Sequence, residues 1–199
     1  MTVSAAQVKE LRNITGAGMM ECKKALIEAK GDLEAATQIL RKRGLSELKK
    51  RSRRVAKEGV IDSYIHFGGR IGVLVEVNCE TDFVARNEEF KRFAHDIAMH
   101  IAAANPLYIS RDEVPLEVMN KERDIYKSQA LEEGKPEKII DKIVEGRLEK
   151  FFQSVCLLEQ PFIRDTDLTV ETYLGEVAGK LGENIVIRRF VHFELGGTT

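Results

Sequence analysis

The sequence predicts an α+β fold, with a small antiparallel sheet covered by helices and preceded by a helical module. Apolar residues alternate with a period of two from Ile71 to Val77, as in a strand with one buried face. Phe90, Phe93 and Ile97 then recur at helical spacing in the segment that follows. Strand and helix patterns that follow one another in separate blocks favour helices packed on one face of an antiparallel sheet.

Residues 1–44 are expected to form a three-helix module. Gly16-Ala17-Gly18 separates the first helix from the second, and Gly31-Asp32 separates the second from the third, with Asp32 as its N-cap. The apolar positions expected in its core are Val8, Leu11, Met20, Leu26, Ile27, Leu33, Ala36, Ile39 and Leu40. The module resembles a ubiquitin-associated-type bundle.

Residues 45–58 are expected to form a basic helical linker that is exposed to solvent. Between Arg41 and Lys57, nine of seventeen residues are Lys or Arg, and Gly44 is the only Gly or Pro. The alternative interpretation is an RNA-binding stripe. Because no aromatic residues alternate with these cations to stack on bases, nucleic acid is not expected to be the main partner.

Residues 59–199 are expected to form the α+β core. Its strands are predicted at Val60–Phe67, Arg70–Asn78 and Ile185–Leu195, with a tight turn at Gly68-Gly69 joining the first two. The third strand is expected to place Ile185, Ile187, Arg189, Val191 and Phe193 on one face. An inserted helical hairpin is predicted at about residues 116–154, around Gly134-Lys135-Pro136, and a last helix at about Val170–Leu181.

Composition restricts the class of protein. The chain has 31 basic and 32 acidic residues, so it lacks the positive surplus of a general polyanion binder. It contains no uncharged apolar run of the roughly 18 residues that a membrane helix needs, and no signal-peptide core, so a cytoplasmic protein without membrane contact is expected. Cys22, Cys79 and Cys156 have no paired spacing and are expected to be buried, reduced thiols.

Most candidate nucleotide, metal and catalytic sites lack the residues that their chemistry requires. Gly16-Ala17-Gly18 follows no strand and ends in no Gly-Lys-Ser/Thr, so no bound nucleotide is expected. The four histidines do not form a convincing metal or catalytic set, and we expect no cofactor, metal or catalytic residue. A hydrolase site formed by Cys79, His66 and Asp82 remains an alternative.

Asp82 and Phe83 are the most informative pair, because they lie between the strand that ends near Asn78 and a helix whose expected N-cap is Asn87. Either the acid caps the turn and the aromatic fills the core, or both point outward toward a partner. Met19 and Met20 have two similar interpretations: both are core residues, or at least one of them is exposed on a surface that binds a partner.

Three motifs together carry a resemblance to a known family. They are Thr15-Gly16-Ala17-Gly18-Met19-Met20, the segment Asn78–Asn87, and Gly182-Glu183-Asn184-Ile185-Val186-Ile187-Arg188-Arg189. Their sequence and order resemble the bacterial elongation factor Ts family, whose members exchange guanine nucleotide on the GTPase elongation factor Tu.

The resemblance implies roles for particular residues. Thr81, Asp82, Phe83 and Val84 match the segment that enters the GTPase next to its magnesium and phosphate site, and Arg12, Met19 and Met20 match the surface by which the N-terminal module docks. The chain has one core repeat where longer members of the family have two in tandem. Resemblance to the short members implies a homodimer that holds two molecules of elongation factor Tu.

Overall fold

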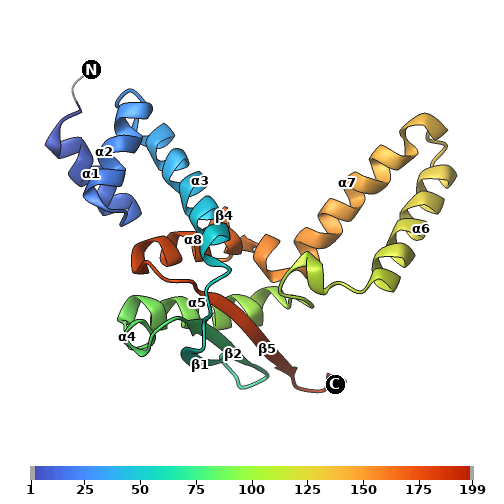
Figure 1. Ribbon diagram of the computed structural model, residues 1–199. Helices are drawn as coiled ribbons and strands as arrows, with labels where there is room; N and C mark the ends of the chain where they lie inside the picture. The colour runs from blue at the N-terminus through green and yellow to red at the C-terminus, as the bar shows by residue number, and fades with distance from the viewer. Residues whose placement is uncertain (1–2, 198–199) are drawn as a thin grey trace. The chain divides into compact units, whose positions relative to one another are not determined.

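The chain folds into two compact units (Figure 1). The structure is a computed structural model that describes residues 3–197, without the side chains of residues 47–49. Among the described residues, the first unit, called the sheet unit here, contains residues 3–102 and 171–197, and the second, called the hairpin unit, contains residues 103–170. Mixed helices and a small antiparallel sheet confirm the α+β class. Within residues 3–197, no helix combines the length and the apolar character needed to cross a membrane.

Three helices begin the sheet unit. They are α1 (Ala5–Thr15), α2 (Met19–Glu28) and α3 (Leu33–Arg51). As expected, Asp32 caps α3, since its carboxylate accepts the N–H of Ala35 at 2.8 Å. The buried residues of this bundle are Val8, Leu11, Cys22, Ala25, Leu26 and Ala36. The prediction that Met20 and Ile27 belong to the core is wrong: they lie seven residues apart on one outward face of α2, with exposed fractions of 64% and 56%.

The third helix continues through the segment predicted to be a linker. It ends at Arg51, whose guanidinium donates to the carbonyl oxygen of Ala178 at 2.7 Å. Gly44 lies close to the backbone of Gly175 in the helix α8 (Val170–Leu181). A Cβ added to Gly44 would lie 3.4 Å from the carbonyl oxygen of Gly175. Part of the basic segment is therefore packed within the sheet unit and is not a fully solvated linker. The division into 1–44, 45–58 and 59–199 stays a prediction.

The sheet has three antiparallel strands in the order β1-β2-β5. They are β1 (Glu58–Ile65), β2 (Ile71–Cys79) and β5 (Val186–Glu194). The hairpin between β1 and β2 is confirmed, and Gly68 and Gly69 adopt φ values of 90° and 66° in its turn. On the inner face, Val73, Val75 and Val77 of the central strand are buried.

A β-bulge in the last strand corrects its predicted face. Val77 pairs with Ile187, but Glu76 pairs with Arg189, so Arg188 is left without a partner in the ladder. The extra residue reverses the alternation: Ile187 is buried on the inner face, whereas Val191 and Phe193 are exposed on the outer face. The prediction that these residues share one face is therefore wrong beyond Arg188.

Two helices complete the sheet unit, with α5 drawn beside the strands in Figure 1. The helix α5 (Glu88–Ala104) buries the apolar positions predicted for it, including Phe90 and Phe93. The helix α8 (Val170–Leu181) packs on α5, where the rings of Tyr173 and Phe93 lie 5.2 Å apart and the Tyr173 hydroxyl donates to Asp96 at 2.9 Å. Because α5 and α8 pack on each other, the segment before α5 and the segment after α8 start from fixed positions in the sheet unit.

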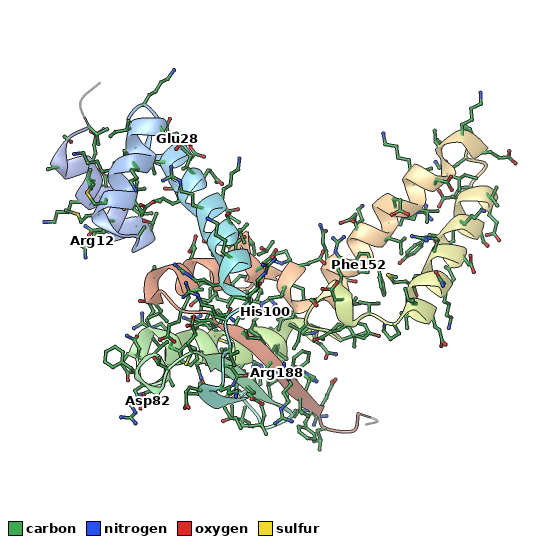
Figure 2. The ribbon with its side chains drawn as sticks, in the orientation of Figure 1. Arg12, Glu28, Asp82, His100, Phe152 and Arg188 are labelled. Atoms are coloured by element: carbon green, nitrogen blue, oxygen red, sulfur yellow. The ribbon has the colours of Figure 1, made fainter. Side chains whose placement is uncertain are left out.

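The hairpin unit is formed by two antiparallel helices, α6 (Leu116–Glu132) and α7 (Glu137–Val155), at the predicted place (Figure 1). Their buried residues include Ala130, Ile140, Val144, Leu148 and Phe152. Figure 2 labels Phe152, and the Arg111 guanidinium lies 4.5 Å from its ring centroid. The unit also contains the short strands β3 (Pro161–Phe162) and β4 (Asp165–Thr169) and two 3-10 turns, η1 (Arg111–Glu113) and η2 (Leu157–Glu159).

Candidate functional site

A four-residue helix, α4 (Asp82–Ala85), connects β2 to α5. Thr81 is its N-cap, because the Thr81 hydroxyl accepts the N–H of Val84 at 3.4 Å. Asp82 is therefore not the residue that caps this turn. Asn87 caps the next helix as predicted, since its side-chain oxygen accepts the N–H of Glu89 at 2.8 Å.

The side chains of α4 divide between solvent and core. Phe83 is 79% exposed, so the alternative in which it fills the core is wrong. Asp82 is also exposed, and its carboxylate pairs with Arg86 at 2.9 Å; Figure 2 shows Asp82 at the periphery of the sheet unit. Val84 is only 5% exposed, so its side chain anchors α4 to the unit, and its contact with a partner stays a prediction. The helix thus presents an acid and an aromatic next to each other while Val84 holds it to the unit.

The thiol behind this site is not suited to nucleophilic chemistry. Cys79 is buried, its Sγ donates to the carbonyl oxygen of Thr81 at 3.2 Å, and burial, with a smaller contribution from the charge of Glu183, raises the pKa of the thiol to about 11. His66 lies beyond the opposite end of β1, eight residues along the ladder from the pair Glu58–Cys79 and so roughly 26 Å away at the usual rise per residue of a strand. The hydrolase alternative with Cys79, His66 and Asp82 is therefore wrong.

All three cysteines are free and buried, as predicted. Burial also raises the pKa of the Cys156 thiol to about 11. A thiol with this pKa is almost entirely protonated at neutral pH, and the thiolate is the reactive form. Cys79 and Cys156 are thus packing residues.

The N-terminal site residues lie at the surface of the bundle. Met19 and Met20 are 49% and 64% exposed at the first turn of α2, which excludes the alternative that both are core residues. Arg12 is exposed in the last turn of α1, and Figure 2 shows it at the rim of the bundle. The cap residue Gly16, with φ of 66°, ends α1 between them.

Sequence reasoning missed Glu80, Glu183 and Asn184 as site residues. Glu183 and Asn184 lie between α8 and β5, and their hydrogen bonds reach the loop that precedes α4. Their only signal in the sequence was membership in the third motif, which indicated no role for them. Contacts between residues more than a hundred positions apart cannot be read from local patterns.

Comparison with known proteins agrees with the three motifs. A family model described as "Elongation factor TS" matches residues 45–197. Proteins named "Elongation factor Ts" from Thermoanaerobacter pseudethanolicus and Acetivibrio thermocellus are each 64% identical over 194 residues, covering 98% of this chain and 95% and 90% of the relatives. The protein of the same name from Geotalea uraniireducens is 60% identical over 196 residues, covering 98% of this chain and 91% of the relative.

Proposed function

Because the chain belongs to the elongation factor Ts family, we propose that it is a guanine-nucleotide exchange factor for elongation factor Tu. It would act in the cytoplasm during translation elongation and speed the release of GDP without breaking a covalent bond itself. The observation that carries the proposal is the 79% exposure of Phe83 beside the exposed carboxylate of Asp82 on a helix anchored by Val84. An exposed aromatic side chain in the segment that matches the family's exchange site is available to fill a pocket of the partner, and aromatic residues are enriched among those that carry most of a binding energy.

The proposed mechanism is thermodynamic linkage. The factor and GDP both bind the GTPase, and each weakens the other; every tenfold of mutual weakening corresponds to about 1.4 kcal/mol of coupling. Phe83 would act as a wedge that moves a segment of the GTPase near its magnesium site, with Asp82 beside it. Loss of the divalent ion would leave the phosphate charge of GDP held poorly by backbone amides alone, and GDP would leave quickly.

The three-helix bundle, which we liken to a ubiquitin-associated module, would dock on the GTPase through Arg12, Met19 and Met20. Methionine suits such a surface, because its flexible and polarisable side chain adapts to a partner. Exposure of both methionines and of Arg12 supports this role.

Replacing Met19 and Met20 together by Ala is expected to weaken association with elongation factor Tu by roughly tenfold, with little loss of stability. Half-exposed side chains contribute little to their own fold but bury apolar area in a complex. Calorimetric titration measures the affinity, and Ile14→Ala serves as the control because Ile14 is 61% exposed on α1. A melting temperature lowered by many degrees would instead place the pair in the core.

The outer face of the sheet supports the homodimer. Its side chains include Ile61, Ile65, Leu74, Val191 and Phe193, all exposed by 47% or more. Phe190, on the inner face beside Val75, does not contribute to this surface. Two copies that pair these faces about a twofold axis would bury an apolar surface that a monomer leaves in water.

Light scattering after gel filtration is expected to report about twice the chain mass, and Leu74→Lys is expected to shift the protein to the monomer. The residues directly opposite Leu74 in the sheet, Ser63 and Val191, are uncharged, so burying a charge at this position opposes association. Leu131→Lys is the matched control, since Leu131 on α6 is 49% exposed and Leu74 is 48% exposed. A wild-type monomer at micromolar concentration, or equal effects of the two variants, would contradict the dimer.

Release of a fluorescent GDP analogue from purified elongation factor Tu tests the proposed function directly. The chain is expected to raise the release rate in proportion to its concentration until the GTPase is saturated. No acceleration at saturating concentration would refute the proposal. Titration of the chain alone with GDP, with no partner present, is expected to give no binding.

A further inference from the structure

Glu183 connects the loop before β5 to the loop before α4. One of its carboxylate oxygens, Oε2, accepts the backbone N–H of Glu80 at 2.9 Å and that of Thr81 at 3.1 Å. Its other oxygen, Oε1, accepts the hydroxyl of Thr81 at 2.5 Å. These three hydrogen bonds to one carboxylate are charge-assisted and hence stronger than hydrogen bonds between neutral groups.

The same two loops are joined a second time in the opposite direction. The Glu80 carboxylate accepts the backbone N–H of Asn184 at 2.6 Å and the guanidinium of Arg54 at 3.4 Å. The buried Asn184 in turn donates from Nδ2 to the carbonyl oxygen of Arg54 at 2.8 Å. Each loop therefore contributes a glutamate that binds the backbone of the other, and the two loops are held as a pair.

Thr81 transmits this arrangement to the exposed aromatic. Its hydroxyl donates to Glu183 and also accepts the N–H of Val84, so it caps α4 while it is itself held in place. A helix of four residues has too few internal hydrogen bonds to keep its direction alone. The direction in which Phe83 points is thus set by the Thr81 cap together with the buried Val84, and the cap is held by Glu183.

We propose that Glu183 is a positioning residue for the exchange site, holding the Thr81 cap so that α4 presents Asp82 and Phe83 in the orientation that the GTPase requires. The inference rests on the proposed function. Glu183 acts through Thr81 and Glu80. Loss of its carboxylate therefore affects what Phe83 does after binding more than it affects binding itself.

Three substitutions at Glu183 separate positioning from charge. Glu183→Ala removes all three acceptor contacts. Glu183→Asp keeps the negative charge, but its side chain is one methylene shorter, so the carboxylate lies farther from Glu80 and Thr81. Glu183→Gln keeps a carbonyl oxygen for the two backbone N–H groups, while its NH₂ can donate to the Thr81 hydroxyl. Glu113→Ala is the matched control, because the Glu113 carboxylate also accepts a backbone N–H, that of Ile109 at 2.8 Å, in the hairpin unit.

GDP release from elongation factor Tu, measured against factor concentration, is expected to show a maximal rate about tenfold lower for Glu183→Ala, with the half-saturating concentration changed by less than about threefold. Glu183→Asp is expected to be slow as well, and it stands in for the Ala variant if that protein does not fold. Glu183→Gln and Glu113→Ala are expected to stay within about threefold of the wild-type rate.

Amide hydrogen exchange of the free protein gives a readout that does not depend on the GTPase. In Glu183→Ala, the amides of Thr81 and Val84 are expected to exchange faster, while those of α7 keep their protection. Equal protection in wild type and variant would overturn the positioning role.

The kinetic outcomes distinguish this inference from the proposed function. A wild-type maximal rate in Glu183→Ala, together with a slow Phe83→Ala variant, would overturn positioning and leave the function intact. A rate equally low in Glu183→Gln, or a change in half-saturating concentration alone, would assign Glu183 to direct contact with the partner and overturn the inference. Wild-type protein that fails to accelerate GDP release would refute the function itself, before any variant is compared.

Discussion

Phe83→Ala is expected to slow GDP release from elongation factor Tu by roughly 30-fold, which corresponds to a hot-spot contribution of about 2 kcal/mol. The side chain is 79% exposed, so its removal takes almost nothing from the core of the sheet unit. In the complex, the same ring would fill a pocket and displace part of the GTPase. The release of fluorescent GDP at saturating factor measures the effect, and thermal unfolding measures the stability of the variant.

Phe67→Ala is the matched control for this substitution. Phe67 is 96% exposed in the turn between β1 and β2, so the two variants lose the same side chain from similarly open surfaces. The control is expected to release GDP at nearly the wild-type rate. If Phe67→Ala and Phe83→Ala slow release equally, the effect is not specific to α4. A loss of about 3 to 5 kcal/mol in Phe83→Ala, the cost of truncating a buried phenylalanine, would contradict its exposure.

Gly59→Ala is expected to reduce the free energy of unfolding by about 3 kcal/mol or more. Gly59 lies in β1 with a φ of 149°, a conformation that residues with a Cβ rarely adopt. A Cβ at this position would lie 2.1 Å from the carbonyl oxygen of Val77 and 2.7 Å from the Cα of Asn78. Both neighbours are backbone atoms of the central strand, so neither can move aside as a side chain would.

Thermal unfolding checks this prediction, with a fall in melting temperature of roughly 6 to 12 °C for a chain of this size. Gly179→Ala in α8 is the control, because a Cβ there meets no atom within 4 Å and Ala favours the helix more than Gly does. The control is expected to leave the melting temperature unchanged or slightly raised. Equal melting temperatures for Gly59→Ala and wild type would mean that β1 adjusts its path along β2 at no cost.

Local signals predicted the longer helices and strands of this fold, but not α4, β3 or β4. Asp32 and Asn87 cap the helices that follow them, and Gly68-Gly69 forms the predicted turn, since each of these preferences depends on only a few neighbouring residues. Helical spacing also placed Phe90 and Phe93 in the core. It did not place Met20 correctly, because hydrophobicity alone does not show whether another element covers a helix face.

Which face of the sheet each residue of β5 lies on depended on how β5 pairs with β2. The bulge at Arg188 exists because β5 aligns with β2 on both sides of one extra residue, and it turns Val191 and Phe193 to the outer face. Nothing in the alternation of apolar residues within β5 indicates where the extra residue falls. The surface proposed for the dimer therefore became visible only in the folded sheet.

The sequence by itself determined the α+β class, the order of its longer helices and strands, and a segment at residues 81–84 that resembles the exchange site of a known family. Only the tertiary structure decided that Phe83 is exposed, that Val84 is an anchor, and that Thr81 caps α4. The physical reason is the range of the interactions. Caps, turns and periodicity act over a few residues, but burial and the carboxylate of Glu183 on Thr81 depend on segments that folding brings together from 102 positions apart.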